Sequence, residues 1–523
     1  VFASLPRLDR HKPKCGPVRP SKMGKRRMWV LIGVHVLIGV HIVWWLVTGS
    51  AITPVEPSEA MQTIEMGRIN AGFLLFLALI ASTLVFGRWF CGWACHVVAL
   101  QDASAWLLGK LGLRPRPVRS RLLVLAPWVV AGHMFAWPLI ENWLGWRDRS
   151  IPPIPGVSEW ELHLTTTELW QTFPGPLMGV LTFVVVGFLV VWWLGAKGFC
   201  THGCPYGAFF AVADRFAPMR IKVTDACDAC GHCTSVCTSN VRVHEEVGKH
   251  RKIVDPGCMK CMDCVSVCPK EALYVGFALP KPFATSQQRI QARADFTWPE
   301  EALLAVVAFV ATQWVFRGAW FGEGVPFLMA VGLGAITALS ALLVVRLVSR
   351  RDLAFQHTSL KIDGRWTRAG RWGGALLVAW LLFAAHTFVV QRWSTTALEA
   401  ALQPVRASIY EKEVSREQLA EALAGLDRYL GWAIVDNPRH VEVRALVLRG
   451  LGRHAEAEQA LLDALGSRPA LLIPEANLAL ANYDLDPARK RYGQAQRLVD
   501  HVLQQSPQHP IARVLQQRLQ SLK

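Results

Sequence analysis

The chain has 523 residues, 52% of them hydrophobic, and a formal net charge of +17. A composition this apolar excludes an ordinary soluble protein and a disordered one, and it predicts a membrane protein with soluble parts. Because excess Lys and Arg beside membrane spans mark the cytoplasmic side, the charge indicates sidedness, and we expect no nucleic acid partner.

A basic tail opens the chain, with nine Lys or Arg and one Asp in residues 1–27. The apolar stretch at about 28–48 is long enough to cross the ~30 Å hydrocarbon core of a bilayer, and it shows no small-residue cleavage site. We interpret it as a retained first span with the N-terminus in the cytoplasm. Further apolar stretches lie near 69–90, 122–140, 176–196, 301–317, 326–346 and 372–390.

The loops between these stretches alternate in charge. Segments 96–121 and 347–371 are basic, whereas segments 49–68 and 141–175 hold Glu residues and suit the outside. Membrane proteins concentrate Lys and Arg in their cytoplasmic loops. The alternation therefore predicts about seven spans, with the C-terminal domain outside the cytoplasm.

Two motifs of the form C-x3-C close the second and the fourth apolar stretch. They lie 109 residues apart, and each is followed by apolar residues and an Asp, which indicates an internal repeat of a helical hairpin. Both motifs fall on the predicted cytoplasmic side, where grouped thiolates favour a soft metal such as copper, zinc or iron–sulfur. The alternative is four buried thiols without a ligand. The cysteines of this candidate redox or metal site are Cys91, Cys95, Cys200 and Cys204.

The stretch 227–269 holds eight of the thirteen cysteines, in two runs of C-x2-C-x2-C-x3-C. Such runs bind [4Fe–4S] clusters, and in two-cluster ferredoxins the fourth cysteine of each run ligates the other cluster. Disulfide frameworks suit short secreted chains, and structural zinc uses C-x2-C pairs with a longer spacer. We predict cluster one on Cys227, Cys230, Cys233 and Cys268, and cluster two on Cys258, Cys261, Cys264 and Cys237.

The tail beyond residue 392 changes character and becomes rich in Ala, Leu, Glu, Gln and Arg at helical spacing. Pro438, Pro469 and Pro507 each follow a helix-like run. Their spacings of 31 and 38 residues average near the 34 of tetratricopeptide (TPR) helix pairs. The pattern predicts a TPR-like domain that binds a protein partner, with an unrelated helical bundle as the alternative.

Histidines in the apolar stretches are candidates for haem or quinol contact, because polar groups at bilayer depth are usually functional. His35 and His41 are six residues apart, about 240° around a helix, so they do not share a face. We therefore do not expect haem. The remaining candidates for quinol contact are His133 and His386 together with these two.

The predicted fold is mainly α. A polytopic membrane helix bundle carries an inserted two-cluster segment like that of bacterial ferredoxins and a C-terminal helical domain. The predicted order is a basic cytoplasmic tail (1–27), a four-helix membrane region with both C-x3-C motifs (28–198), the cytoplasmic ferredoxin-like segment (199–280), a linker (281–300), three further membrane helices (301–392) and the TPR-like domain (393–523).

Two C-x3-C motifs ahead of a two-cluster ferredoxin segment resemble the NapH/NosR-type family, over about residues 28–275. That family includes the quinol-linked membrane ferredoxin of periplasmic nitrate reduction, the membrane electron donor of nitrous-oxide reduction and the copper-reducing assembly factor of cytochrome oxidase. Pro205 after Cys204 keeps the family pattern, whereas His96 after Cys95 departs from it. The resemblance implies electron transfer in the inner membrane of a bacterium, with quinol and a redox protein as partners.

We expect a membrane-bound electron carrier or a subunit of an oxidoreductase system, which passes electrons between a membrane pool, or a partner complex, and the cytoplasmic clusters. Two alternatives stay open. One is a copper-reducing or metal-delivery assembly factor that acts through the C-x3-C thiols. The other is a redox sensor or scaffold, in which the helical tail binds a partner.

Overall fold

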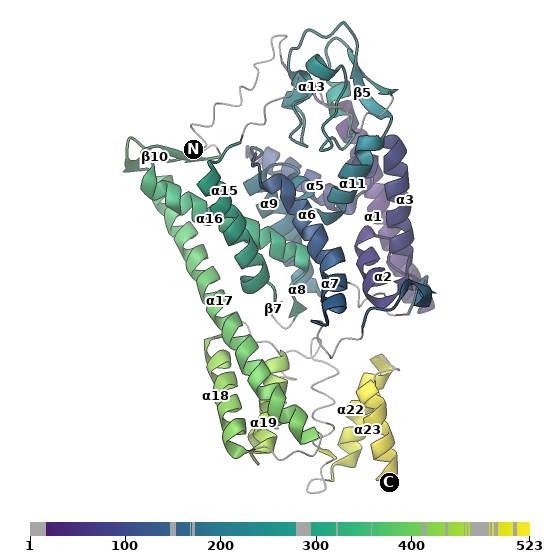
Figure 1. Cartoon of the computed structure of the whole chain (residues 1–523), viewed down its shortest axis with the longest axis vertical. Coiled ribbons are helices and arrows are strands. Elements are labelled where there is room, and N and C mark those ends of the chain that lie inside the picture. The colour runs from purple at the N-terminus through teal and green to yellow at the C-terminus, as the bar shows by residue number, and fades with distance from the viewer. Residues whose placement is uncertain are drawn as a thin grey trace. The chain divides into compact units, whose positions relative to one another are not determined.

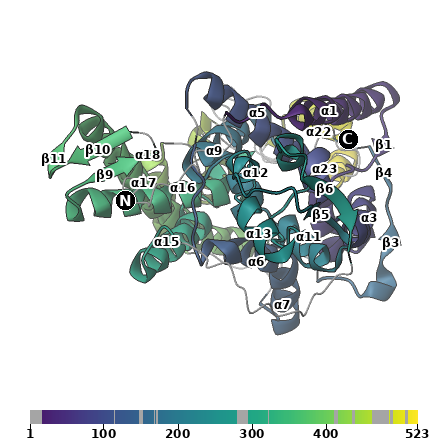
Figure 2. The ribbon, with the colours of Figure 1, turned by 90° about the horizontal axis from the view of Figure 1, so that it is seen from above.

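The computed structural model forms two compact units, described here separately: Val1–Val310 with Phe327–Leu381, and Ala311–Pro326 with Leu382–Lys523. Figures 1 and 2 show the ribbon from the side and from above. The basic tail up to residue 16 and most of the predicted linker lie outside the described residues. The structure describes residues 17–522 apart from 114, 147–152, 168, 170–172, 279–293, 321–322, 357, 410–414, 435–437, 454, 458, 461–480, 482–483, 486–489 and 506–509.

Five helices are long and apolar enough to cross a membrane, judged by length and composition, as in a multi-pass membrane protein. Each coincides with one of the apolar stretches found in the sequence. Two of them contain a π-helical turn between α-helical parts. They are α1 (Lys22–Thr48), α6 to α7 with η3 (Leu123–Leu144), α8 to α9 with η6 (Pro176–Leu194), α16 (Phe327–Ser349) and the first part of α17 (Arg368–Trp393 of Arg368–Ile409).

A sixth candidate span is broken. Helix α3 (Ala71–Phe86) meets the helical stretch Trp89–Lys110 at 98°, and Gly87 turns the chain between them with a φ of +68°. The remaining stretch, 301–317, contains α15 (Trp298–Val310), which continues into the π-helical turn η7 (Ala311–Val315). Among the described residues, this stretch is not one of the helices that are long and apolar enough to span a membrane. Seven spans therefore stay a prediction.

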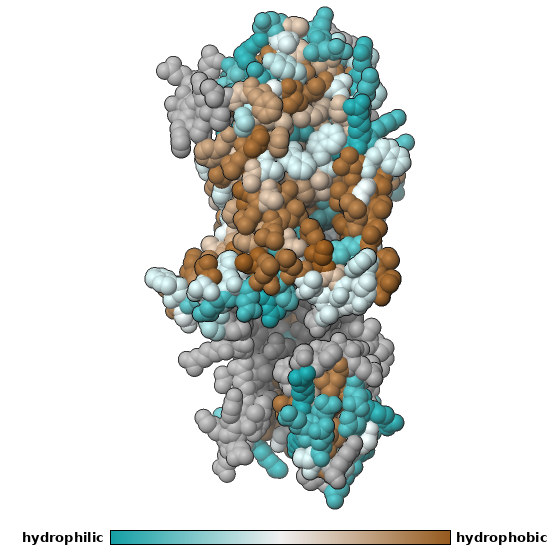
Figure 3. All heavy atoms as spheres, turned by 90° about the vertical axis from the view of Figure 1, so that its right-hand side faces the viewer, coloured by the Kyte–Doolittle hydropathy of each residue, from teal (hydrophilic) through white to brown (hydrophobic). Residues whose placement is uncertain are grey.

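The outer surface of these helices is apolar, as a lipid environment requires. On α1 only Arg27 and Leu31 are buried, while Trp44 and Val47 are 62% and 79% exposed. Figure 3 shows a broad hydrophobic band over the helices of the first unit, with hydrophilic residues gathered over the ferredoxin segment next to it. Lipid, rather than protein, is therefore the neighbour that this surface fits.

Two short helical hairpins repeat one another at a distance of 109 residues. Helix α4 (Trp89–Trp93) leads into α5 (His96–Lys110), and α10 (Gly198–His202) leads into α11 (Pro205–Phe216). The second cysteine of each C-x3-C motif is the N-cap residue of the longer helix. With 15 and 12 residues, α5 and α11 extend about 22 and 18 Å, so neither spans a bilayer alone.

Helix α11 lies along α3 and runs in the same direction. The Tyr206 and Phe76 rings are 5.8 Å apart, and at the other end Asp214 accepts a hydrogen bond from the Arg88 backbone. Phe76 lies ten residues, about 15 Å, before the end of α3. The hairpins therefore carry their cysteines into the helix bundle and return toward the ferredoxin segment.

The ferredoxin-like segment is a small α/β unit beside these hairpins. Its antiparallel strands β5 (Met219–Val223) and β6 (Leu273–Phe277) join its two ends. Between them lie three helices and two cysteine loops around a shared apolar core. The helices are α12 (His232–Ser235), α13 (Val243–His250) and α14 (Asp263–Ser266).

Short strands and helices complete the chain. Strand β1 (Ala51–Ile52) pairs with β4 (Thr165–Thr166), β2 (Arg68–Ile69) with β3 (Glu161–Leu162), β7 (Ala319–Trp320) with β8 (Glu323–Gly324), and β9 (Leu353–Phe355), β10 (Thr358–Ile362) and β11 (Arg365–Trp366) form one sheet. The loop before α3 holds η1 (Pro57–Glu59) and α2 (Ala60–Met66).

The part of the second unit from Leu382 onward is helical where it is described. Helix α18 (Arg416–Trp432) packs on α19 (Pro438–Gly450), and α22 (Tyr492–Gln505) packs on α23 (Pro510–Ser521). Pro438 opens α19, while Pro469 and Pro507 lie outside the described residues. Two helix pairs suit a helical repeat without defining one, so the TPR-like domain stays a prediction.

Candidate iron–sulfur and thiol centre

The first cysteine run lines a pocket together with one cysteine of the second run. Four thiols surround it, and they are the four that crossed ligation assigns to cluster one. The fourth comes from the far end of the second run, because α14 carries the chain back past the first loop. This thiol set fits a [4Fe–4S] cluster. The lining cysteines are Cys227, Cys230, Cys233 and Cys268.

The second run gathers in the same way around the last cysteine of the first. Cys237 interacts electrostatically with Cys258 and Cys261, and Cys264 does so with all three. These four are the ligands that the sequence assigns to cluster two. Both sets therefore have the crossed composition.

The two cysteine loops have matching backbones, 31 residues apart. Ala229 and Lys260, each just before the second cysteine of its run, both have a positive φ, near 56° and 50°. Asn240 and Glu271, each three residues after the last cysteine, do so as well. Residues other than Gly rarely adopt a positive φ, and backbone strain of this kind concentrates at functional sites. The repetition indicates that both loops are shaped for the same ligand.

Within the described part of the chain, no three His, Cys, Asp or Glu side chains lie close enough together for a single metal ion. In a [4Fe–4S] cube each thiolate binds a different iron atom, so its ligands lie farther apart than those of one ion. This finding therefore gives no support to a single copper ion at the C-x3-C motifs.

Burial dominates the electrostatics of the cluster thiols. It raises the pKa of Cys261 to about 11, against the opposing charge of Lys197, and it raises the pKa of Cys233 to about 12. Desolvation disfavours the thiolate, so these thiols carry protons at neutral pH until iron binds and displaces them. The site is a low-dielectric one, in which fixed charges act strongly.

Helix α4 packs directly on the loop of cluster two. A Cβ atom at Gly92 would overlap the carbonyl oxygen of Met259, so only glycine permits this approach. The Trp93 indole donates a hydrogen bond of 2.9 Å to the carbonyl of Lys260. The first C-x3-C motif therefore touches the Cys258–Cys261 loop.

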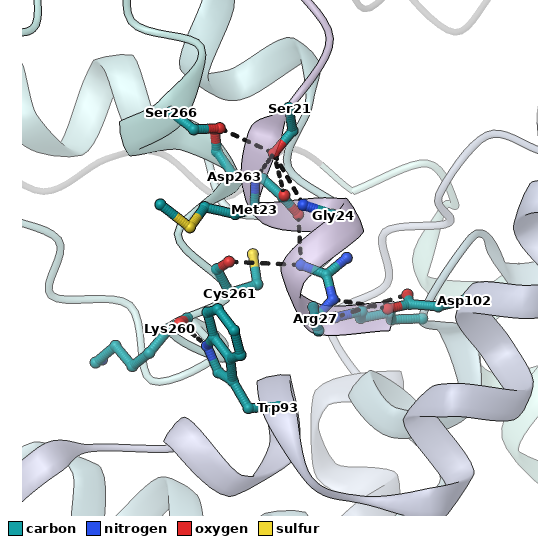
Figure 4. A network of polar contacts seen from close by, with 11 residues as sticks. Ser21, Met23, Gly24, Arg27, Trp93, Asp102, Lys260, Cys261, Asp263 and Ser266 are labelled. Carbon is teal, nitrogen blue, oxygen red and sulfur yellow. Dashed lines mark hydrogen bonds and ion pairs between the residues drawn. The ribbon is translucent and has the colours of Figure 1, made fainter. Parts of the chain in front are cut away.

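The N-terminal helix is tied to the same loop by buried charges (Figure 4). Arg27 pairs with Asp263 at 2.8 Å and with Asp102 at 3.0 Å, and it lies near the Cys261 carbonyl. Ser21 donates to Asp263 at 2.5 Å and is the N-cap of α1. Removing one partner of a buried pair is strongly destabilising, so this network fixes cluster two against α1 and α5.

A second buried network ties the same loop and strand β5 to α11. Asp214 on α11 is fully buried and pairs with Arg220 at 2.8 Å and with Lys260 at 2.9 Å. Asp102 and Asp214 are the acidic residues noted after the two motifs in the sequence. Both serve as anchors between the helix bundle and the ferredoxin-like segment.

The four C-x3-C thiols lie in one neighbourhood. Cys91 and Cys200 are buried in a single apolar cluster, against which Cys95 and Cys204 pack. Met259, next to the Cys258 ligand of cluster two, belongs to the same cluster. The convergence expected from the repeat is therefore present, at the side of the segment that holds cluster two.

An acidic loop approaches these thiols from the other end of α3. His96 at the start of α5 lies 3.7 Å from Glu56, although the charge pattern had placed the two on opposite sides of the membrane. Tyr206 interacts electrostatically with Cys204, Glu56 and Glu59. The separation was wrong because α5 begins inside the bundle, at the tip of a hairpin, and not at its surface.

The other membrane histidines show no shared site among the described residues. His35 contacts the Leu31 carbonyl at 2.8 Å, and His41 contacts the Ile52 carbonyl at 2.8 Å. His133 packs on the Phe327 ring. Quinol contact by one of these histidines or by His386 stays a prediction.

Several charged residues of the site escaped the sequence analysis. Arg27, Lys197 and Lys260 are buried beside cluster two or the thiols, although they read as part of the basic surface. The sequence did contain one indication that Arg88 and Lys197 belong to the site, because they occupy equivalent positions of the 109-residue repeat. Surface charge and buried charge are otherwise alike in a sequence.

Fold and site together define a multi-pass membrane protein with a ferredoxin-type segment docked on two cysteine-bearing hairpins. A family model described as a 4Fe-4S binding domain matches residues 71–114 and 177–224, which are the two hairpins with their preceding helices. A model described as a 4Fe-4S dicluster domain matches residues 226–273. No solved structure matches the chain.

Curated relatives carry ferredoxin-type names. The methylamine utilization ferredoxin-type protein MauN of Methylorubrum extorquens is 28% identical over 37% of this chain and 66% of its own length. The ferredoxin-type protein NapH of Haemophilus influenzae is 27% identical over 43% and 72%. The putative electron transport protein YccM of Escherichia coli is 26% identical over 48% and 67%.

NapH- and MauN-type ferredoxin-like 4Fe-4S proteins are therefore homologues of this chain, which confirms the resemblance drawn from its cysteine motifs. The chain matches 66% and 60% of the lengths of two MauN proteins.

Proposed function

We propose that this protein transfers electrons between a lipophilic carrier in the membrane and two [4Fe–4S] clusters, which it holds at one face of its helix bundle. The observation that carries the proposal is the contact between the first C-x3-C motif and the loop of cluster two, at Gly92 and Met259. This contact joins the membrane helices to the clusters through a buried path. The electron-transport and ferredoxin-type names of the relatives support the same class.

The chain's own share of the chemistry is to hold, shield and order the centres. A [4Fe–4S] cluster supplies one-electron oxidation and reduction when bound. Cys258, Cys261, Cys264 and Cys237 would hold cluster two beside the hairpins, and the pocket of Cys227, Cys230, Cys233 and Cys268 would hold cluster one on the far side. We infer the order membrane carrier, cluster two, cluster one, soluble redox protein.

The four C-x3-C thiols form the intermediate station in this order. They lie between the acidic loop and cluster two, in one buried group. Grouped thiolates bind iron–sulfur or another soft metal, and paired thiols exchange with disulfides. Either state would let the group pass charge between carrier and cluster.

A quinol fits the carrier's place. Its oxidation releases two electrons and two protons, and two one-electron clusters accept the electrons. The protons need a base: burial, with the neighbouring Glu56 charge, raises the pKa of Glu59 to about 7, and a general base works best near the operating pH. The Tyr206 hydroxyl beside this loop is buried without a hydrogen-bond partner among the described residues, so it can contact a quinol oxygen.

We place the clusters and the N-terminus in the cytoplasm of a bacterial cell and the C-terminal helical domain outside, where it would bind a protein partner. The basic residues of segments 96–121 and 347–371 support this sidedness.

The test is reduction of the purified, iron-loaded protein by a short-chain quinol, followed by EPR. We expect the signals of two reduced [4Fe–4S] clusters. Changing all four C-x3-C cysteines to Ser should abolish reduction by quinol while dithionite still reduces both clusters. Unchanged quinol reduction in this variant would exclude the thiols from the path, and no reduction of the unmodified protein would overturn the proposal.

A further inference from the structure

Two buried cations occupy equivalent positions of the internal repeat. Arg88 and Lys197 lie 109 residues apart, each three residues before the first cysteine of its motif. They are only 5% and 1% exposed. Each keeps a nitrogen without a hydrogen-bond partner among the described residues, Nε of Arg88 and Nζ of Lys197. The repeat has therefore placed the same feature twice.

Arg88 faces both the thiols and the loop of cluster two. Its Nη2 atom lies 4.0 Å from the sulfur of Cys91, and its Nη1 atom donates a hydrogen bond of 3.0 Å to the carbonyl of Pro256. Pro256 lies two residues before Cys258. The guanidinium thus bridges the first C-x3-C motif and a cluster loop.

Lys197 faces the same two groups from the other hairpin. It interacts electrostatically with Cys200 of the second motif and with Cys261 of cluster two. The nearest carboxylate oxygen, Oδ1 of Asp102, is 3.8 Å away, and Asp102 also pairs with Arg27 at 3.0 Å. Asp102 is the strongest electrostatic partner of the ammonium, and Lys197 therefore shares its nearest carboxylate with Arg27.

Buried cations are costly unless an anion lies nearby. Two buried carboxylates at this interface are already paired, Asp214 with Arg220 and Lys260, and Asp263 with Arg27. Asp255 interacts with Arg88 as well, but it also interacts with Lys260, and it accepts a hydrogen bond from the Gly257 backbone. Further negative charge beside the two cations would come from the thiolates of cluster two and from the cluster that they would hold. Reduction makes a cluster more negative, so a buried cation favours its reduced state.

We propose that Arg88 and Lys197 are a matched pair of positioning residues that stabilise the negative charge arriving at cluster two and raise its reduction potential. The inference rests on the proposed function, because it concerns the cluster on the membrane side of the path. Cluster one has no such pair among the residues that line its pocket: Lys270 there is exposed, so water and salt screen its charge.

The experiment is an EPR-monitored redox titration of the full-length protein in detergent, with dithionite as reductant. The Cys258→Ser variant identifies the signal of cluster two. In Lys197→Met and in Arg88→Met we expect that signal to titrate at a more negative potential than in the unmodified protein, with the signal of cluster one unmoved. Lys197→Arg keeps the positive charge, so in this variant the potential of cluster two should stay close to that of the unmodified protein. Lys270→Met is the matched control and should leave cluster two in place.

If removing a cation causes loss of the cluster, the inference can be tested by a variant that removes a nearby negative charge instead. Asp102→Asn removes the carboxylate nearest Lys197 and should move cluster two to a more positive potential. The inference would be overturned if cluster two had the same potential in Lys197→Met as in the unmodified protein, or a more negative potential in Asp102→Asn. Because dithionite replaces quinol, these outcomes are independent of whether quinol is the donor, and failure of quinol reduction leaves this titration readable.

Discussion

Cys237 tests the geometry of the centre at the scale of one residue. It follows the first run in sequence but lies with the thiols of the second. We expect Cys237→Ser to disturb the EPR signal of cluster two and to lower the iron content by up to one cluster, because one of its four thiolate ligands is replaced. The Cys268→Ser variant is the counterpart and should affect cluster one. Loss confined to cluster one in Cys237→Ser would show that each run holds its own cluster.

Glu59 tests the proton side of quinol oxidation. Its pKa lies near 7, so the carboxylate is protonated below that pH and can accept protons above it. Quinol-dependent cluster reduction should therefore rise as pH increases through about 7. In Glu59→Gln the rate should fall about a hundredfold, the usual contribution of a general base, and the pH dependence should flatten.

Stopped-flow absorbance of the clusters measures these rates. Glu159, an exposed carboxylate in a later loop, provides the control, and Glu159→Gln should retain the full rate. A Glu59→Gln rate equal to that of the unmodified protein would exclude this carboxylate as the proton acceptor.

At the scale of elements, the contact of α4 with the loop of cluster two depends on Gly92, which has no side chain. We expect Gly92→Ala to push α4 away from Met259 and to cost about 1–3 kcal/mol of stability, the usual cost of an overpacked site. Electron transfer from the membrane should fall while the clusters remain reducible by dithionite. Thermal unfolding and quinol reduction, measured side by side, check both effects.

Gly109 on α5 is the matched control for this substitution. A Cβ there meets no atom within 4 Å, and Gly109→Ala replaces a poor helix former with a good one. We therefore expect equal or higher stability and full activity. If Gly92→Ala behaves like Gly109→Ala, the close approach of α4 has no functional role.

How far the sequence could predict the structure also differs between elements. The cysteine runs and the five continuous spans were predictable because ligand spacing and apolar length are local signals. The repeat of the hairpins was predictable from the 109-residue spacing of the C-x3-C motifs, but the sharp bend after α3 was not, because α3 and the stretch after it form one apolar run until Gly87 turns the chain. That turn placed His96 beside Glu56, which loop charge alone could not reveal.

At the scale of the whole molecule, sidedness is the outstanding prediction. With seven spans, reporters fused after residue 280 and after residue 523 should report opposite sides of the membrane: a cytoplasmic reporter active in the first fusion and a periplasmic one in the second. A reporter in segment 347–371 is the control and should be cytoplasmic. Matching sides for the two fusions would mean that 301–317 or another stretch does not cross.

The pair between Arg27 and Asp263 joins residues 236 positions apart. A ribosome adds about 5–20 residues each second, so Asp263 emerges roughly 10–50 seconds after Arg27. During that interval the first helix sits in the membrane with a charge meant for burial and no carboxylate from the cluster loop. During synthesis, α1 therefore spends this interval without its contact to the loop of cluster two.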